Sequence, residues 1–287
     1  MNAPVQPDRY AVLGNPVAHS RSPFIHAAFA EQTGQSLVYE RLLCPLDGFA
    51  AQVRAFAASG ARGCNVTVPF KQEAFALAPR HSPRAALAGA ANTLRFDAEG
   101  WWADNTDGVG LVRDIEAGAG LPLAGLRVLL LGAGGAAAGV LGPLLAARPA
   151  VVVVANRTAP KALALAAAHA EWAHRHGATL SAGGLDDPSL MAAPFDCVLN
   201  ATASSLQGAG APVPARTLSP GALAVDLMYG PAAESFMAWA AAAGARPRDG
   251  LGMLVEQAAE AFHAWRGVRP DTAPVLQALR ATMPAAR

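Results

Sequence analysis

Apolar and polar positions alternate along the first hundred residues in short blocks of differing period. Brief apolar runs, typical of buried strands, are separated by stretches of about ten residues in which apolar side chains recur at helical spacing. The predicted strands are Tyr10–Gly14, Leu37–Leu43 and Gly63–Val68, and the predicted helices are Pro23–Gln32 and Phe49–Ala58. Within the third strand, Val66 and Val68 are expected to face a core, while Asn65 and Thr67 share the opposite face.

The same alternation continues in a second unit that begins near Asp107. Strands that alternate with helices favour an α/β fold with a largely parallel sheet. The predicted helices are Val109–Gly118, Ala136–Ala147, Ala232–Ala243, Leu254–Trp265 and Pro274–Ala281, and the predicted strands are Arg127–Leu131, Val151–Ala155, Cys197–Asn200 and Ala222–Asp226.

Residues 128–147 carry no charged side chain, over a length that suffices for a membrane span. However, Gly132, Gly134 and Gly135 follow a short branched run, and Pro143 interrupts the remainder. A buried strand, a tight turn and a buried helix explain this composition better than a span. We therefore expect no association with a membrane.

Composition narrows the classes of function. Hydrophobic residues make up 53% of the 287 positions, which excludes intrinsic disorder, and a net charge of +1 leaves no surplus for nucleic acid or anionic lipid. The three cysteines, Cys44, Cys64 and Cys197, are odd in number and widely spaced, so neither a disulfide framework nor a thiolate metal site is indicated. The seven histidines show no metal-ligand spacing, and the N-terminus does not resemble a secretory signal. We expect a cytoplasmic protein without a metal.

The glycine turn after the strand Arg127–Leu131 indicates a cofactor. Gly132-Ala133-Gly134-Gly135-Ala136-Ala137 follows a short apolar strand and opens a helix, and it fits the pattern G-x-G-x-x-G/A of dinucleotide-binding proteins. The first glycine permits the tight turn, and the second lets backbone N–H groups approach a pyrophosphate at the helix N-terminus. A glycine-rich packing turn is the alternative.

The end of the next strand discriminates between cofactors. An NAD site places an acidic residue about 20 positions after the turn, where it binds the ribose 2′-hydroxyl. Here the strand runs into Asn156-Arg157-Thr158, with Lys161 following, and no acid is present. Two cations and a hydroxyl suit a 2′-phosphate, so NADP is favoured over NAD, although a solvated strand end remains an alternative.

Several polar residues of the first hundred positions are candidates for chemistry. Only Lys71 and Lys161 are lysines, against twenty arginines, and a lysine can be tuned for proton transfer whereas an arginine cannot. Each candidate also has a simpler interpretation: Lys71 as a surface residue, Ser22 and Asp107 as helix caps, and Asn92 as a turn residue.

Seven segments together resemble the shikimate dehydrogenase family, in that family's order and nearly end to end. They are GNPVAHSRSPFIH (14–26), NVTVPFK (65–71), ANT (91–93), DNTDG (104–108), GAGGAA (132–137), NRT (156–158) and DGLGMLVEQA (249–258). The resemblance implies a two-domain α/β fold: residues 1–106 plus 250–287 form a substrate-binding domain, to which the C-terminal helices return, and residues 107–249 form a Rossmann-type NADP-binding domain.

The resemblance also implies an activity, the reversible reduction of 3-dehydroshikimate to shikimate by NADPH. Lys71 and Asp107 correspond to the family's catalytic pair, with Lys71 exchanging a proton with the substrate oxygen. The implied substrate-binding residues are Ser20, Ser22, Asn65, Thr67, Asn92, Tyr229 and Gln257. The implied NADP-binding residues are Gly132, Ala133, Gly134, Gly135, Ala136, Asn156, Arg157, Thr158, Lys161, Leu227 and Gly250.

Three alternatives stay open beside this interpretation. A quinate/shikimate dehydrogenase of relaxed specificity is the nearest, but the serine pair and the missing acid after Val154 speak against it. A non-catalytic NADP sensor predicts loss of Lys71 or Asp107, and both are present. A folate-type NADP dehydrogenase does not need Ser20, Ser22, Asn65 and Asn92 together. A monomer or a homodimer is expected, with a small-molecule substrate and no nucleic-acid partner.

Overall fold

The computed structural model describes residues 6–202 and 211–283, and the chain forms two compact units. The first unit contains the chain up to Thr106 together with Val255–Ala281, and the second contains Asp107–Leu254 with Thr282 and Met283. The second crossing between the units therefore lies between Leu254 and Val255, whereas the sequence-based division placed the return at residue 250.

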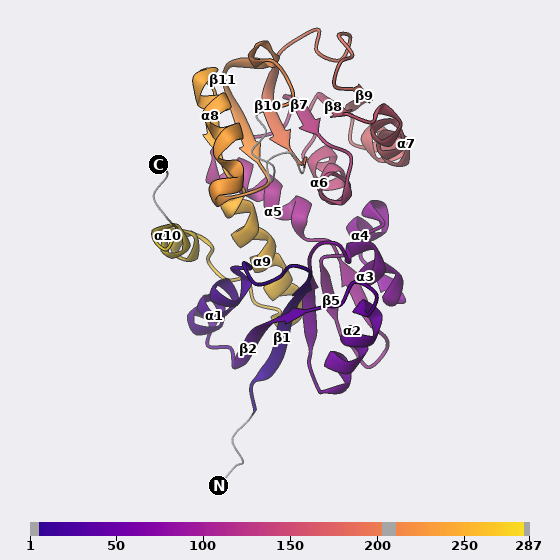
Figure 1. Cartoon of the computed structure of the whole chain (residues 1–287), viewed down its shortest axis with the longest axis vertical. Coiled ribbons are helices and arrows are strands. Elements are labelled where there is room, and N and C mark those ends of the chain that lie inside the picture. Colours follow the sequence, from indigo (N-terminus) through magenta and orange to yellow (C-terminus); the bar gives the residue numbers. More distant parts are fainter. Residues whose placement is uncertain (1–5, 203–210, 284–287) are drawn as a thin grey trace. The chain divides into compact units, whose positions relative to one another are not determined.

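The first unit is built on a six-stranded mixed sheet (Figure 1). The strand order is β2-β1-β3-β5-β6-β4, in which β5 pairs antiparallel with both β3 and β6. Its elements are β1 (Asp8–Gly14), α1 (Ser22–Thr33), β2 (Leu37–Leu43), α2 (Phe49–Ala58), β3 (Gly63–Val66), α3 (Lys71–Leu77), β4 (Arg80–His81), α4 (Pro83–Ala88), β5 (Thr93–Arg95), β6 (Trp102–Asp104), most of α9 (Leu251–Arg266) and α10 (Ala273–Ala281).

Two cores cover the two faces of this sheet. On one face, Leu13 of β1 and Cys64 of β3 pack with Phe49 of α2 and Phe70 before α3. On the other face, aromatic rings of α1, α9 and β1 pack together. Phe29 of α1 packs on Phe262 of α9, and the ring of Tyr10 of β1 stacks on that of Trp265 of α9, with ring centroids 4.6 Å apart. The C-terminal segment thus completes the core of the N-terminal unit.

The second unit is a doubly wound parallel sheet with the strand order β12-β11-β10-β7-β8-β9. The order reverses between β7 and β10, the switch point at which such sheets bind ligands. Its elements are α5 (Asp107–Arg113), the π-helical turn η1 (Asp114–Gly118), β7 (Arg127–Leu131), α6 (Gly135–Ala146), β8 (Val151–Asn156), α7 (Ala159–Arg175), β9 (Thr179–Gly184), β10 (Phe195–Asn200), η3 (Ala215–Thr217), β11 (Leu218–Asp226), η4 (Gly230–Ala233), α8 (Glu234–Ala242) and β12 (Arg246–Arg248).

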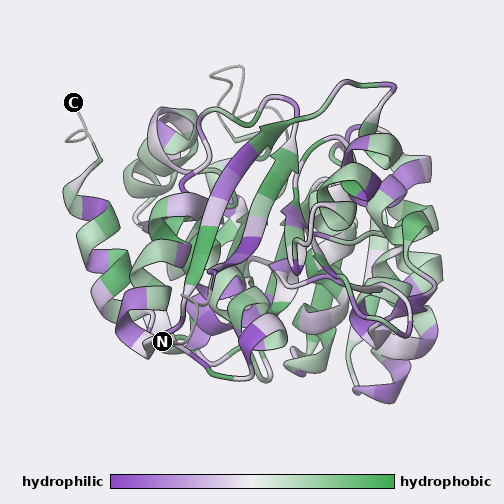
Figure 2. Ribbon diagram, turned by 90° about the horizontal axis from the view of Figure 1, so that it is seen from below, coloured by the Kyte–Doolittle hydropathy of each residue, from purple (hydrophilic) through white to green (hydrophobic). Residues whose placement is uncertain are grey.

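Alternate strand residues of this sheet enter two separate cores. Val128 and Leu130 of β7 pack against α5, α6 and α7, whereas Leu129 and Leu131 pack with Phe236 of α8. Because both faces are covered, the central strand β7 buries side chains on both sides, as expected of parallel sheets. Figure 2 shows the complementary pattern in the helices, many of which carry hydrophilic and hydrophobic residues in turn along their length.

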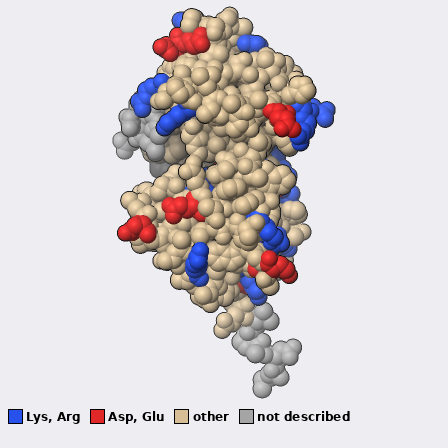
Figure 3. All heavy atoms as spheres, turned by 90° about the vertical axis from the view of Figure 1, so that its right-hand side faces the viewer, with Lys and Arg blue, Asp and Glu red and all other residues tan. Residues whose placement is uncertain are grey.

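Charged residues are sparse and mixed in sign at the surface. On the face shown in Figure 3, basic and acidic side chains lie interspersed on a mostly uncharged surface, as the charged fraction of 15% implies. Among the described residues, no helix is both long and apolar enough to cross a membrane. The uncharged stretch 128–147 forms β7, the glycine turn and the 12-residue helix α6, which confirms the interpretation made from its composition.

Some elements differ from the prediction. Strand β3 ends at Val66, and the side chain of Val68 is 60% exposed, so the expectation that Val68 faces a core is wrong. The chain leaves the sheet there because Pro69 has no N–H to donate to a neighbouring strand. The predicted helix Val109–Gly118 changes at Asp114 from α5 to the π-helical turn η1.

The three cysteines are free and fully buried. Cys44 and Cys64 lie in the first unit, and Cys197 lies in β10 of the second. Burial raises the pKa of each thiol, to about 12 for Cys197. These side chains act as small apolar groups of the cores.

Candidate active site

The serine pair of the first unit lies at the start of α1. Ser22 is the first helical residue and Arg21 occupies the N-cap position, so the expectation that Ser22 caps the helix with its side chain is wrong. Instead, the Ser20 hydroxyl accepts the backbone N–H of Ser22 at 3.3 Å and donates to its hydroxyl oxygen at 3.2 Å. Arg41 donates twice to the carbonyl of Ser20, at 2.9 and 2.6 Å, and so holds this segment against β2.

Asn65 is buried at the centre of the sheet, and both polar atoms of its amide are bonded. Its Nδ2 donates to the carbonyl of Asn92 at 3.1 Å and to the hydroxyl of Thr93 at 3.0 Å. Its Oδ1 accepts the hydroxyl of Tyr39 at 2.7 Å. Thr67, which follows β3, is half-buried, and its backbone N–H still bonds to Leu13 of β1. The register of the strands therefore brings Asn65 beside Asn92 and Thr93.

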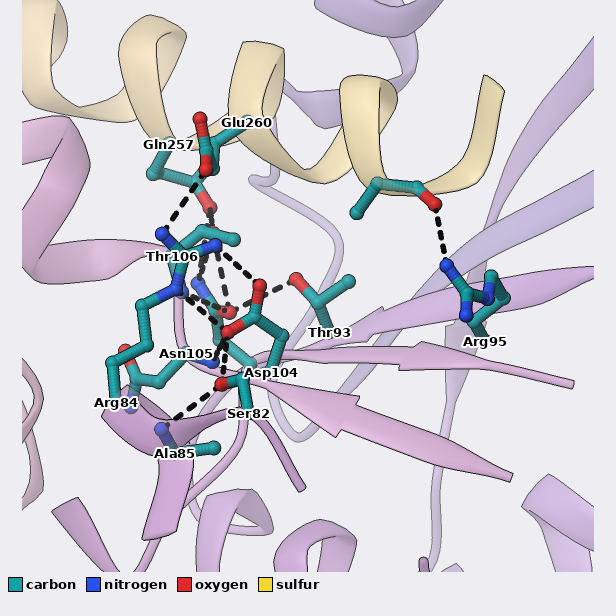
Figure 4. Close-up of polar contacts among 12 residues, drawn as sticks. Ser82, Arg84, Ala85, Thr93, Arg95, Asp104, Asn105, Thr106, Gln257 and Glu260 are labelled. Atoms are coloured by element: carbon teal, nitrogen blue, oxygen red, sulfur yellow. Dashed lines mark hydrogen bonds and ion pairs between the residues drawn. The ribbon is translucent and has the colours of Figure 1, made fainter. Parts of the chain in front are cut away.

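Asn92, Thr106 and Gln257 form a second buried cluster (Figure 4). Asn92 Nδ2 donates to Thr106 Oγ1 at 2.9 Å and to Gln257 Oε1 at 3.1 Å, while Asn92 Oδ1 accepts the N–H of Thr106 at 2.9 Å. Gln257 comes from α9, so the returning helix contributes directly to the polar cluster of the first unit.

Asp104 and Arg84 support this cluster (Figure 4). The Asp104 carboxylate is fully buried and accepts bonds from Ser82, from Nε and Nη2 of Arg84 and from the N–H of Asn105. Arg84 also donates to Glu260 of α9 at 3.0 Å. Burial disfavours the guanidinium charge, but Asp104 and Glu260 outweigh it and raise the pKa of Arg84.

The candidate catalytic residues lie in different units. Lys71 is the first residue of α3, is half-buried, and accepts the N–H of Ala91 with its backbone carbonyl at 2.8 Å. Asp107 is the first residue of α5 in the second unit, with 7% of its surface exposed. Within the described residues, no group of three His, Cys, Asp or Glu side chains is arranged to hold a metal ion.

The glycine turn of the second unit has the geometry that a pyrophosphate requires. Gly132 has φ +106°, in the left-handed region, and a Cβ there would lie 3.0 Å from the carbonyl oxygen of Ala201. Gly134 and Gly135 are exposed at the N-terminus of α6, and a Cβ at either position would meet no atom within 4 Å. The backbone N–H end of α6 is therefore open to an anion, and the first helical turn contains no acidic residue to repel one.

The end of β8 presents unpaired positive charge next to this turn. The glycine turn is tied to β8 by a bond of 2.8 Å from the Gly132 N–H to the carbonyl of Ala155. Arg157, Thr158 and Lys161 are exposed, and within the described parts of the chain the side chains of Arg157 and Lys161 form no ion pair. Asn156 is anchored by a bond to the carbonyl of Thr158 at 3.0 Å. These residues fit a phosphate better than a ribose hydroxyl.

The remaining candidate residues of the second unit, Leu227, Tyr229 and Gly250, follow strands β11 and β12. The N–H of Leu227 donates to the carbonyl of Asn200 at 3.0 Å, and the N–H of Gly250 donates to the carbonyl of Met228 at 2.8 Å. A Cβ on Gly250 would lie 2.3 Å from the carbonyl oxygen of Leu227, so only glycine fits. Tyr229, the last candidate, is half-buried after β11.

The structure adds polar residues that the sequence analysis missed. Asn200 and Asp226 end neighbouring strands, are buried, and share a bond of 2.9 Å, while Tyr39 and Arg84 bond to polar residues of the first unit. Polar residues directly after apolar strand runs are a usable signal for Asn200 and Asp226. Tyr39 and Arg84 have no such signal, because their partners are distant in sequence.

The parallel sheet with its open glycine turn, together with a first unit rich in buried amides and hydroxyls, defines a two-domain enzyme of the dinucleotide-dependent class. Residues 12–94 match the model of the shikimate dehydrogenase substrate binding domain, 116–209 that of shikimate / quinate 5-dehydrogenase, and 250–280 that of the shikimate 5′-dehydrogenase C-terminal domain.

Known proteins are similar to this chain over nearly its whole length. A shikimate dehydrogenase (NADP(+)) of Methylibium petroleiphilum is 64% identical over 96% of this chain and 95% of its own. An Ael1 enzyme from Pseudomonas putida is 48% identical, with a TM-score of 0.88 over 97% of this chain and 100% of its own. The structure of shikimate 5-dehydrogenase from Thermus thermophilus, in complex with NADP(H) and shikimate, is 36% identical, with a TM-score of 0.82 over 96% and 99% of the two chains. The chain belongs to the shikimate dehydrogenase family.

Proposed function

We propose that this protein is an NADP-dependent shikimate dehydrogenase, which interconverts 3-dehydroshikimate and shikimate. The observation that carries the proposal is the 64% identity with a curated NADP-dependent shikimate dehydrogenase across nearly the whole of both chains. The open helix N-terminus at Gly134–Gly135 and the exposed cations Arg157 and Lys161 after β8 support the choice of NADP.

The substrate is expected to bind the polar side chains of the first unit. Ser20 and Ser22 are assigned to the carboxylate, because a serine hydroxyl has a proton to donate to a carboxylate oxygen. Asn65, Thr67, Asn92 and Gln257 are assigned to the ring hydroxyls, and Tyr229 of the second unit to the carboxylate side. A buried set of this kind discriminates strongly against analogues that leave its polar groups without partners.

Lys71 and Asp107 are assigned to proton transfer. When NADPH is bound, it supplies the hydride for the ketone carbon of the substrate. The oxygen of that carbon then needs a proton, and the ammonium group of Lys71 is the assigned donor. Asp107 is assigned to orient the substrate hydroxyl and the ammonium group. In the reverse direction, Lys71 takes the proton back.

The cofactor-binding residues belong to the second unit. The turn Gly132–Ala136 is assigned to the pyrophosphate, and Asn156, Arg157, Thr158 and Lys161 are assigned to the 2′-phosphate. Leu227 and Gly250 are assigned to the remainder of the cofactor, where the absence of a side chain on Gly250 lets two backbone segments approach. By this assignment the NADP-binding residues lie within 107–249 and at Gly250, while residues 1–106 and 250–287 supply the substrate-binding residues other than Asp107 and Tyr229.

A dual specificity for quinate and shikimate is the second candidate. It is favoured by the match of residues 116–209 to a model that covers both shikimate and quinate 5-dehydrogenases. Nothing specific favours an NADP sensor or a folate-type dehydrogenase. A cytoplasmic location and a monomeric or homodimeric state stay predictions.

A four-way assay tests the proposal. Purified protein receives shikimate or quinate, each with NADP or NAD, and the absorbance of the reduced cofactor is followed. Activity confined largely to shikimate with NADP is expected. Comparable turnover of quinate assigns the protein to the dual-specificity group, and silence in all four reactions by a protein that still binds NADP contradicts an enzymatic role.

A further inference from the structure

Tyr39 connects the serine pair to the amide cluster of the first unit. The hydroxyl of Ser20 donates to Ser22 Oγ at 3.2 Å, and the side chain of Ser22 lies near enough to the phenol of Tyr39 to influence its pKa. Tyr39 then donates to Asn65 Oδ1 at 2.7 Å. Beyond it, Asn65 Nδ2 donates to Thr93 Oγ1 at 3.0 Å. From Tyr39 through Asn65 to Thr93 the donors run in one direction, an arrangement in which each bond strengthens the next.

The bond from Tyr39 stabilises one orientation of the Asn65 amide. With its hydroxyl proton on Oδ1, the amide presents Nδ2 to two acceptors, the carbonyl of Asn92 and the hydroxyl of Thr93. A flipped amide would place its oxygen against the carbonyl of Asn92, where two acceptors face each other. The carbonyl of Asn92 can only accept and so requires Nδ2 on its side, and the phenol of Tyr39 stabilises this orientation by donating to Oδ1.

The ring of Tyr39 is itself fixed. It stacks on the ring of His26 with centroids 4.2 Å apart and planes 8° from parallel, and His26 is fully buried. Burial raises the pKa of Tyr39 well above its usual value, against a smaller opposing effect from Ser22, so the phenol keeps its proton. The hydroxyl therefore remains a donor across the neutral pH range.

We propose that Tyr39 is a positioning residue for substrate binding, which holds the Asn65 amide in its productive orientation and keeps it in register with the Ser20–Ser22 pair. The inference rests on the proposed function, in which Asn65 binds a ring hydroxyl and the serines bind the carboxylate. Its consequence is specificity for a ring carboxylate whose acid and hydroxyl groups match the spacing between the serine pair and an Asn65 amide held by Tyr39.

Tyr39→Phe tests this, because it removes the hydroxyl and keeps the stacked ring. We expect the KM for shikimate to rise about tenfold, the effect of leaving one buried acceptor without its donor. The Kd for NADP, measured by fluorescence, and the KM for NADP should change less than about twofold, a difference of well under 1 kcal/mol. Tyr10→Phe is the matched control, since Tyr10 is a buried tyrosine of the same unit that stacks on Trp265 instead.

A double-mutant cycle separates positioning from general destabilisation. If Tyr39 acts through Asn65, adding Tyr39→Phe to Asn65→Ala changes the KM for shikimate no further than Asn65→Ala alone. The inference is wrong if the KM for shikimate of the double variant rises by the product of the two single effects. It is also wrong if Tyr39→Phe has the same KM as the unmodified enzyme. If the unmodified enzyme oxidises no shikimate, the proposed function fails and this inference fails with it.

Discussion

His26 is a titratable residue that the fold keeps neutral. Its ring is fully buried between Tyr39 and Phe262, and neither ring nitrogen has a hydrogen-bond partner among the described residues. Burial lowers its pKa from 6.5 to about 3, and the nearby Asn65 side chain opposes this shift without overcoming it. A charged imidazole in this aromatic cluster is therefore incompatible with the folded state.

The free energy of unfolding should depend on pH through His26. Between pH 6.5 and pH 3 the unfolded chain binds a proton on His26 and the folded chain does not. The free energy of unfolding is therefore unaffected by His26 above pH 6.5 and decreases as the pH falls below that value. We expect a loss of about 2 kcal/mol from His26 between about pH 7.5 and pH 5. Urea unfolding of the wild type and of His26→Phe at the two pH values measures it, and equal losses in both proteins contradict the assignment.

Lys71→Ala should lower the turnover number at least ~100-fold, the lower end of what a positioned proton donor contributes. The expected effect falls on kcat, because the residue acts on the reacting oxygen. Steady-state kinetics with shikimate and NADP measure it, and an unchanged Kd for NADP shows that the second unit is intact. Turnover near the wild-type value would rule out the assigned role.

Arg157→Ala should raise the KM for NADP at least ~10-fold and leave the KM for NAD nearly unchanged, because only NADP carries the 2′-phosphate. Arg175→Ala is the matched control, as Arg175 is exposed at the far end of α7 and pairs with Glu171. Equal effects on the two cofactors would show that Arg157 does not bind this phosphate.

At the scale of elements, a buried ion pair joins the π-helical turn to β12 and lies against the start of α9. Arg248 of β12 donates to both oxygens of Asp114, which is 2% exposed. The carboxylate lies so close to α9 that a Cβ on Gly252 would be 1.8 Å from Asp114 Oδ1. Glycine is otherwise unfavourable inside a helix, so its presence at position 252 is explained by this approach.

Gly252→Ala should therefore displace Asp114 and lower the free energy of unfolding by at least ~3 kcal/mol, the scale of a broken buried ion pair. Chemical denaturation of the single and double variants measures this. In an Asp114→Ala background the added methyl group meets no carboxylate, and Gly252→Ala should then be nearly neutral. A similar loss in both backgrounds would place the cause elsewhere.

Elements with strong local patterns were predictable. The bounds of β2, α2 and β7 are those predicted from the sequence, because each segment has an unbroken pattern typical of its type of element. The strands β5 and β6 were not predicted, because three residues are too few to show a period, and the antiparallel pairing of β5 has no local signal. The Ala-rich helix that ends near His174 was expected, but the bounds of α7 were not predicted, because its many alanines fit any face.

Candidate site residues were predictable where they lie in a short contiguous motif, such as the glycine turn or Asn65–Lys71. The supports of the site were not. Arg84 reaches Glu260, and Asn92 reaches Gln257, across more than half of the chain. Such pairings depend on the return of α9 to the first unit, which no periodicity in the sequence encodes.

At the scale of the whole molecule, the two units differ in how the chain builds them. The described core of the second unit comes from one continuous segment, Asp107–Leu254, whereas the first unit needs Val255–Ala281 to cover the face of its sheet that carries Tyr10. The first unit is therefore complete only after the last helices are made.

Fragments of the chain test this asymmetry. Residues 107–254 expressed alone should fold and bind NADP without turning over shikimate, while residues 1–106 alone should fail to fold, because Phe29 and Tyr10 lose their α9 partners. Circular dichroism and NADP titration measure both outcomes. A cooperative unfolding transition in the 1–106 fragment would contradict the expectation.

The buried cysteines give this protein a built-in probe of its own fluctuations. A thiol of raised pKa inside a core reacts with alkylating reagents only when its surroundings open, so its labelling rate measures how often they open. Cys44 and Cys64 monitor one unit and Cys197 the other. Mass spectrometry of each thiol during labelling would show, without any engineered reporter, whether shikimate and NADP each slow the opening of the unit assigned to bind them.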